Sequence, residues 1–182
     1  MGVFVRQGRG WLFPPKVRFG DIVRGLPLPD DSVLAVYCSH VLEHIPRDCV
    51  PRALANTFRI LVPGGTFRLV VPDLEWRAMH YLEAARQSES GAADRCLESL
   101  FMGGRQRQRN LSELLRWIFG NSAHLWMYDF PLLSRLLEDA GFARIRRCDF
   151  GDAAIAEFSE VEERSRFFED GKPELAIESI KP

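Results

Sequence analysis

Two histidines stand at a spacing that could support proton transfer or metal binding. His40 and His44 lie four residues apart, so a helix would place both on one face, with Glu43 beside them as a solvated acid or an acid in the first turn of that helix. An imidazole near its ordinary pKa can remove a proton from a hydroxyl at neutral pH, which makes His44 a candidate general base. His44 could equally be a structural histidine that caps local backbone groups. The pair lacks the H-E-x-x-H pattern and an evident third ligand, so the sequence predicts no metal site.

Polar side chains at the ends of predicted elements are further candidates for a binding site. Asp21 follows Gly20, a pair that favours a turn. Asp73 comes after a predicted strand and before a predicted helix, so it either caps that helix or contacts a bound molecule. His124 and Tyr128 precede another predicted helix and could line a pocket.

The elements that must position these residues alternate between strand and helix. Residues 33–39 (VLAVYCS) form an apolar run of strand length, as in a parallel strand covered on both faces. Apolar residues recur at helical spacing over 47–61, and the Val-Pro-Gly-Gly of 62–65 ends that helix. Residues 67–71 are the next strand, and a further helix begins after Asp73. This order favours a parallel α/β sheet.

The middle of the chain is predicted to be helical. Residues 88–122 read as two helices separated by 103–109, a stretch with three arginines and no acid. That stretch is either a solvated loop or a loop that faces an anion. We treat 88–128 as a helical, substrate-side insertion in a single domain over 1–182, with 1–20 as an atypical N-terminal segment.

The C-terminal part adds one helix and two strands. Asp129 is a predicted helix N-cap, and leucines at helical spacing follow it as far as Gly141, a residue suited to end a helix. Residues 143–150 and 174–180 read as the last two strands. The stretch 149–170, rich in acids, is expected to be exposed.

Composition limits the class of protein. The 182 residues are 46% hydrophobic and carry a formal net charge of −1, which fits a globular domain and excludes a disordered or collagen-like chain. A nucleic-acid-binding protein normally has a basic excess, and a membrane span needs about 18 consecutive apolar residues. The chain has neither, and its four cysteines form no C-x-x-C pair. We therefore expect a cytoplasmic protein with no nucleic-acid or membrane partner.

A series of motifs runs through the first half of the chain. Its parts are Asp21, Leu-Pro-Leu-Pro-Asp at 26–30, Ser-His-Val-Leu-Glu-His at 39–44 and Leu-Val-Pro-Gly-Gly at 61–65, with His-Leu-Trp-Met-Tyr-Asp following at 124–129. In this order the motifs resemble the class I S-adenosylmethionine-dependent methyltransferases, closest to the type 11 group, over about residues 17–182. The resemblance implies a Rossmann-like α/β sheet with helices on both faces. It also implies S-adenosylmethionine as cofactor and a small-molecule or sugar-like methyl acceptor.

The resemblance also implies which residues contact the cofactor. Asp21 would accept a hydrogen bond from the adenine amino group, and Ile22 would cover the adenine ring. Cys38, Ser39 and His40 would lie where the methionine part of the cofactor approaches the end of a strand.

On the acceptor side the resemblance leaves fewer constraints. His44 is the candidate catalytic base, and Asp73, His124 and Tyr128 are the candidate acceptor-binding residues. Methyl transfer from a sulfonium mainly requires alignment and exclusion of water, so no catalytic triad is expected.

Two features of this family are missing from the sequence. The glycine-rich loop after the first strand and the acidic end of the second strand are not visible, because only 20 residues precede Asp21 and one βαβ unit needs about 30. Leu34 also replaces the family's acid at the start of the fourth strand. The sequence therefore predicts an N-terminally truncated fold, and an alternative function is a catalytically inactive domain that serves as an interaction or oligomerisation module.

The missing first strand has a structural consequence. It would leave the strand at 33–39 with an unpaired edge, which favours association. Residues 2–6 (GVFVR) could take the place of that strand, a second copy could cover the edge in a homodimer, or the natural chain could begin further upstream.

Overall fold

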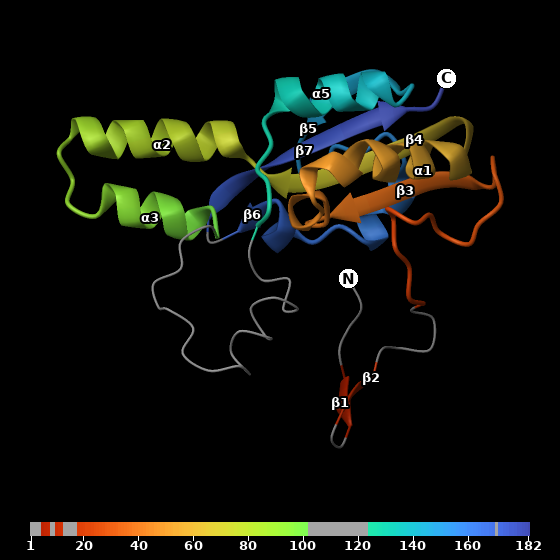
Figure 1. Cartoon of the computed structure of the whole chain (residues 1–182), viewed down its shortest axis with the longest axis horizontal. Helices are drawn as coiled ribbons and strands as arrows, with labels where there is room; N and C mark the ends of the chain where they lie inside the picture. Colours follow the sequence, from red (N-terminus) through yellow and green to blue (C-terminus); the bar gives the residue numbers. More distant parts are fainter. Residues whose placement is uncertain (1–4, 8–9, 13–17, 102–123, 170) are drawn as a thin grey trace.

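The computed structural model describes residues 5–7, 10–12, 18–101, 124–169 and 171–182. Its centre is a sheet in the order β3-β4-β7-β5, with β6 paired to β7. Helices α1 and α5 lie against this sheet, and the pair α2 and α3 extends beyond one of its ends (Figure 1). The strands are β3 (Val33–Ser39), β4 (Leu61–Pro72), β5 (Ala143–Cys148), β6 (Phe168–Glu169) and β7 (Lys172–Ile180).

The strand directions make the sheet mixed. β3 pairs with β4 in parallel, and β7 lies between β4 and β5 and is antiparallel to both. The crossover from β3 to β4 passes through the 3₁₀ helices η1 (Leu42–His44) and η2 (Arg47–Cys49) and then α1 (Val50–Ile60). The predicted parallel alternation holds for β3, β4 and β5, while β7 enters the sheet in the opposite direction. This is a Rossmann-like α/β fold, as predicted.

One face of the sheet is covered by two amphipathic helices. α1 and α5 (Phe130–Asp139) present apolar residues at helical spacing to the strands. Leu54, Leu133 and Leu137 are fully buried in the same cluster as Phe67 and Leu69 of β4. Burial of these side chains is the main stabilising term for this layer.

The other face is covered by the segment that was predicted to be an exposed acidic stretch. It forms the 3₁₀ helices η3 (Ala156–Glu160) and η4 (Arg164–Arg166) and buries Phe158 and Phe167. Glu162 is buried as well. Most described residues of this stretch are exposed, as predicted, but Phe158, Glu162 and Phe167 are not, because the two rings pack on the sheet and Glu162 has a cationic partner beneath them.

That partner is Arg68, in the middle of β4. Its guanidinium is fully buried, pairs with Glu162, and donates hydrogen bonds to the carbonyls of Asp152 at 3.0 Å and Asp149 at 2.8 Å. Glu178 of β7 lies 3.7 Å away. The buried charge is therefore held by carboxylates and carbonyls from three segments, as a buried ion must be.

Two helix starts are set by local capping, as the sequence predicted. The Asp73 carboxylate accepts a hydrogen bond from the Trp76 amide at 3.2 Å and begins α2 (Leu74–Arg86). The Asp129 carboxylate accepts one from the Leu132 amide at 2.9 Å and begins α5. Gly141 follows α5 with φ +99°, the left-handed conformation expected after a helix.

The region predicted to be a helical insertion is described in part. α3 (Ala92–Ser99) is a helix that packs beside α2. The arginine-rich stretch 103–109 and the second predicted helix lie outside the described residues. No helix in the described part of the chain is long and apolar enough to cross a bilayer.

The outer edge of β3 has no strand beside it in the described residues. β1 (Val5–Gln7) and β2 (Gly10–Leu12) pair only with each other, antiparallel. The idea that residues 2–6 take the place of the missing strand was therefore wrong for Val5 and Arg6. A partner a few residues away closes a shorter loop than β3 would, and so costs less chain entropy.

The ion pair below the sheet gives a stability prediction. Replacing Arg68 by methionine should lower the free energy of unfolding by about 3–5 kcal/mol, because Glu162 would remain as a buried carboxylate without its guanidinium. Urea unfolding followed by circular dichroism measures the change. The matched control is Arg135→Met, since the pair of Arg135 with Asp139 is exposed and should contribute less than about 1 kcal/mol. Equal losses in the two variants would contradict the role given to Arg68.

Candidate functional site

The candidate site begins where β3 ends. His40 follows the strand with φ +53°, a left-handed conformation that a non-glycine residue rarely adopts. Its amide donates a hydrogen bond to the Val70 carbonyl at 2.9 Å, which continues the ladder with β4. The chain then turns at once into η1. Backbone strain of this kind is concentrated at functional sites.

A groove runs along the open edge of β3. It has a volume of about 460 Å³ and is lined by residues of the 20–26 loop, by β3 and by the segment around η4. Four consecutive residues, 36–39, line it. Because their side chains alternate between the two faces of the sheet, the groove follows the edge of the strand and not one face.

Three of the five predicted cofactor-binding residues line this groove. They are Ile22, Cys38 and Ser39. The hydroxyls of Ser39 and of Tyr37, which also lines the groove, are buried and lack a hydrogen-bond partner of good geometry in the described part of the chain. Buried hydroxyls of this kind normally have a partner, so these two are candidate ligand-binding groups.

Asp21 holds the loop that carries Ile22. Its Oδ1 accepts hydrogen bonds from the amides of Val23 at 2.8 Å and Arg24 at 3.2 Å. Asn56 of α1 fastens the same loop from the other side by donating to the carbonyls of Ile22 and Val23 at 3.0 and 2.8 Å. The same hydrogen bonds therefore fix the turn and the apolar wall of the groove. The second Asp21 oxygen, Oδ2, makes a weaker, exposed contact to Arg24 at 3.5 Å.

His40 is not among the residues that line the groove, and its side chain makes polar contacts instead. Its Nε2 lies 3.0 Å from the Arg166 carbonyl, which can only accept, so Nε2 carries a proton. Its Nδ1 lies 3.3 Å from Oε1 of Glu43. Burial lowers the pKa of His40, but the nearby Glu43 carboxylate and the Arg166 carbonyl outweigh it, and the net direction of the pKa is upward.

Glu43 is fully buried in the first turn of η1, which agrees with the predicted helix acid and excludes the solvated alternative. Its carbonyl accepts hydrogen bonds from the amides of Leu125 at 2.7 Å and Trp126 at 3.3 Å. These bonds attach the start of the 124–128 segment to η1 and draw it over the carboxylate. The signal that would have revealed this burial is the apolar character of the neighbours Leu42 and Ile45, both buried.

His44 and His124 are brought together by this attachment. Their ring centroids are 5.1 Å apart in an edge-on arrangement, and Nε2 of His44 lies 3.9 Å from Oε1 of Glu43. The His44 side chain is 22% exposed, so the cluster opens to solvent on one side. The structure thus places the predicted base and one predicted acceptor-binding residue in contact distance.

Tyr128 and Asp73 do not share that opening. Tyr128 is fully buried, its hydroxyl donates to the Leu42 carbonyl at 3.4 Å, and burial raises its pKa to about 12. The backbones of Asp73 and Tyr128 form an isolated parallel β-bridge. The Asp73 side chain caps α2 and lies 3.8 Å from Arg147. It faces a different hollow, of about 400 Å³, on the β5 side of the sheet.

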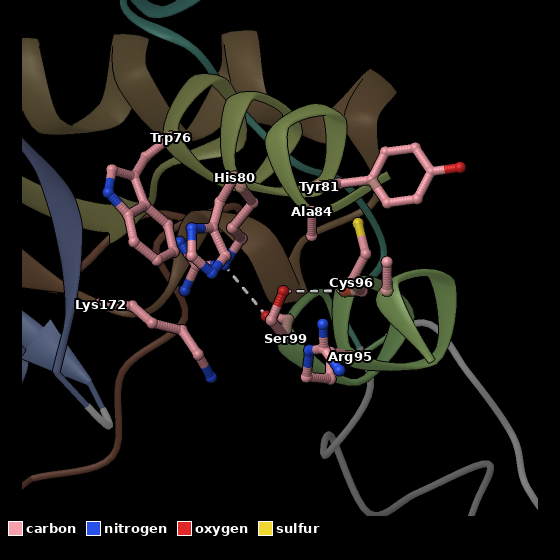
Figure 2. Close-up of a pocket in the computed structure, with 10 residues that line it drawn as sticks. Trp76, His80, Tyr81, Ala84, Arg95, Cys96, Ser99 and Lys172 are labelled. Carbon is pink, nitrogen blue, oxygen red and sulfur yellow. Dashed lines mark hydrogen bonds between the residues drawn. The ribbon is translucent and has the colours of Figure 1, made fainter. Parts of the chain in front are cut away.

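A third, smaller hollow of about 90 Å³ lies between α2 and α3 (Figure 2). Its deepest cation, Arg77, is saturated by Glu174 at 2.8 and 3.0 Å and by the Ser99 carbonyl at 3.0 Å. The Trp76 and His80 rings stack above it at 4.9 Å. Arg77 therefore joins α2 to α3 and β7. Because its guanidinium is already bound by these groups, it is not available to bind a ligand in the hollow.

Comparison with known proteins identifies the family. A model described as "Methyltransferase domain" matches residues 9–146. The chain belongs to this methyltransferase family. The resemblance stated from the motifs at 21–65 is confirmed, and no curated protein matches the chain significantly.

Solved structures of methyltransferases are similar to this methyltransferase domain at low identity. One is a Haloferax volcanii methyltransferase in complex with the activator Trm112 (20% identity, 90% of this chain, 59% of that chain, TM-score 0.47). Another is a SAM-dependent methyltransferase from Archaeoglobus fulgidus (14%, 89%, 66%, TM-score 0.46). A third is a Haemonchus contortus phosphoethanolamine N-methyltransferase in complex with S-adenosyl-L-methionine (10%, 89%, 36%, TM-score 0.45). The chain spans less than two thirds of each of these proteins.

Two residues of the methyltransferase domain's site escaped the sequence reasoning. Asn56 lies on the predicted helix, but its role depends on the 22–23 loop that it contacts. Arg166 contributes a backbone carbonyl, which every residue type has and which therefore gives no sequence signal. Both contacts join segments that are distant in sequence. Helical periodicity alone gave no signal for either.

The thiols of the methyltransferase domain give a reactivity prediction. Burial raises the pKa of Cys38 to about 12, so at pH 8 only about one molecule in ten thousand carries the reactive thiolate. Cys49 is only half-buried and should be alkylated by iodoacetamide much faster than Cys38. Peptide mass spectrometry over a time course measures both rates. Labelling of Cys38 as fast as Cys49 would contradict the buried site.

Proposed function

We propose that this domain transfers a methyl group from S-adenosylmethionine to a small-molecule or sugar-like acceptor. The observation that carries the proposal is the groove at β3, which Ile22, Cys38 and Ser39 line in a chain of the methyltransferase family. Its volume lies within the range of about 300–1,000 Å³ that small-molecule sites occupy. The hydroxyls of Tyr37 and Ser39, which have no hydrogen bond of good geometry in the described part of the chain, give it polar groups to orient a ligand.

The residues of the groove would divide the work of holding the cofactor. Ile22 offers an apolar surface to the adenine ring, and the Asp21 Oδ2 is the acceptor for its amino group. Cys38 and Ser39 lie at the carboxyl end of β3, where α/β sheets bind their ligands. When bound, the cofactor supplies an electrophilic methyl group, so that the protein needs only to align the acceptor and exclude water.

His44 is the residue we assign to the acceptor. Its side chain is partly exposed beside the end of β3, and an imidazole can take the proton of a hydroxyl acceptor at neutral pH. His124 lies against it and would shape the acceptor pocket. Asp73 and Tyr128 would act on this pocket through the backbone bridge that holds the 124–128 segment.

We also infer a cytoplasmic setting. All four cysteines are free in the structure, and a reducing compartment keeps such thiols reduced.

A cofactor-binding titration tests the assignment. We expect S-adenosylhomocysteine to bind the full chain in isothermal titration calorimetry and Asp21→Asn to weaken binding by about tenfold. Asparagine keeps the oxygen that accepts from Val23 and Arg24 but replaces Oδ2 by a donor, which removes about one hydrogen bond, roughly 1.4 kcal/mol.

The control for that titration is Asp30→Asn, an exposed acid in the neighbouring loop that pairs with Arg59. It should leave the affinity unchanged. An absence of binding by the unchanged protein would reject the proposal and favour an inactive interaction domain.

A second candidate function, an oligomerisation module, rests on the open edge of β3. Leu34 on this strand is 76% exposed, and the described residues supply no neighbouring strand. An exposed strand edge presents unpaired amides and carbonyls to a second chain. The occupant we propose is a second copy of the chain.

Light scattering tests the dimer. At micromolar concentration the mass should be that of two chains, and Leu34→Lys should shift it toward one, because an edge lysine opposes strand addition. Since Leu34 is exposed, the variant should fold as the original does, which circular dichroism checks. A monomeric mass for the unchanged protein would rule the homodimer out.

A further inference from the structure

Three side chains beside the end of β3 converge on one point. One carboxylate oxygen of Glu43 and one ring nitrogen each of His44 and His124 lie within 4.8 Å of one another. We propose that these three residues bind a divalent transition-metal ion, with Zn²⁺ as the representative ion. Sequence spacing predicted no metal site here because the third ligand, His124, is far from the other two along the chain.

The Glu43 carboxylate is the observation that points to a cation. It is fully buried, and neither oxygen has a hydrogen-bond partner in the described part of the chain. The groups that face it are two imidazoles, His40 at 3.3 Å and His44 at 3.9 Å, both from Oε1. Buried carboxylates are normally paired, hydrogen-bonded or bound to a metal, and Oε2 of Glu43 has none of these.

The fold holds the three ligands on two rigid pieces. Glu43 and His44 are consecutive in η1, whose place is fixed by the β3–β4 ladder. His124 is brought to them by the hydrogen bonds from Leu125 and Trp126 to the Glu43 carbonyl. The site is therefore built by backbone contacts that exist without any ion.

The donor set suggests the class of metal. Two imidazoles and one carboxylate are ligands of catalytic zinc and of other divalent transition metals, which leave further positions open. Bonds of roughly 2.0–2.2 Å place tetrahedral ligands about 3.4 Å apart, so atoms that now lie up to 4.8 Å apart must approach one another by up to about 1.4 Å. Rotation of the partly exposed His44 ring can supply this movement.

His40 completes the surroundings of the proposed ion. Its Nδ1 faces Oε1 of Glu43 while the Arg166 carbonyl holds its Nε2. Ligating carboxylates are commonly oriented by such an outer partner. The open coordination position faces the solvent side at His44 and, if the methyl-transfer function proposed above holds, would receive an oxygen of the acceptor.

Titration with the metal alone tests the site. The full-length chain, freed of metal with a chelator, is titrated with Co²⁺ and Zn²⁺ in the absence of cofactor and acceptor. We expect one ion per chain and visible cobalt absorption without the sulfur-to-cobalt band that a cysteine ligand would add. His44→Ala, His124→Ala and Glu43→Gln should each weaken binding by more than about 100-fold.

The matched control is His80→Ala, which removes a histidine that stacks on Trp76 outside the cluster. It should bind as the unchanged protein does. Zn²⁺ should also raise the Tm of the unchanged protein and of His80→Ala but not of His44→Ala, because an ion that binds only the folded state stabilises it. Glu43→Gln keeps the shape of the buried side chain and guards against a result caused by misfolding.

The proposal is overturned if the unchanged chain binds neither ion, or if removal of His44 and of His124 leaves the affinity unchanged. A cobalt spectrum with sulfur ligation would also overturn it, since it would place the ion on cysteines. Because no cofactor is present, these results are independent of the S-adenosylhomocysteine titration. Each proposal can therefore fail while the other stands.

Discussion

The parallel pairing of β3 with β4 is the interaction on which the candidate site depends. The last amide of that ladder is the one His40 donates to the Val70 carbonyl, and it fixes the point at which the chain leaves the sheet. The left-handed turn at His40 then sends the backbone directly into η1. This turn positions Glu43 and His44. The Glu43 carbonyl then positions the 124–128 segment through its hydrogen bonds from Leu125 and Trp126. Loosening the end of the ladder would therefore displace Glu43, His44 and the 124–128 segment.

The buried charges show how the rigid frame differs from the site. Arg68 and Arg77 are both buried, and each is surrounded by carboxylates and carbonyls that satisfy its donors. These two ion pairs join β4, β7, α2 and the segment below the sheet. Glu43 is different, because in the part of the chain the structure describes it is a buried carboxylate with no hydrogen bond to either oxygen. A buried carboxylate without a hydrogen bond, beside a frame of satisfied charges, is the arrangement expected where a protein binds something.

The open edge of β3 is where both proposed functions are placed. The groove that three predicted cofactor-binding residues line follows this edge. Binding of a ligand in the groove and pairing with another strand would draw on the same strip of backbone. If both proposals hold, cofactor binding and self-association compete for this edge or are coupled through it.

The sequence by itself determined the elements whose causes are local. Asp73 and Asp129 cap helices through hydrogen bonds to amides three residues away, and the apolar run of β3 and the helical spacing of α1 reflect the environment of each segment. The family motifs likewise lie within single segments. Only the tertiary structure decided that Glu43 is buried, that His124 reaches His44, and that Glu162 pairs with Arg68 inside a stretch that reads as solvated. These contacts join residues far apart along the chain, and no residue type or spacing encodes them, because their energy depends on which segments the folded sheet brings together.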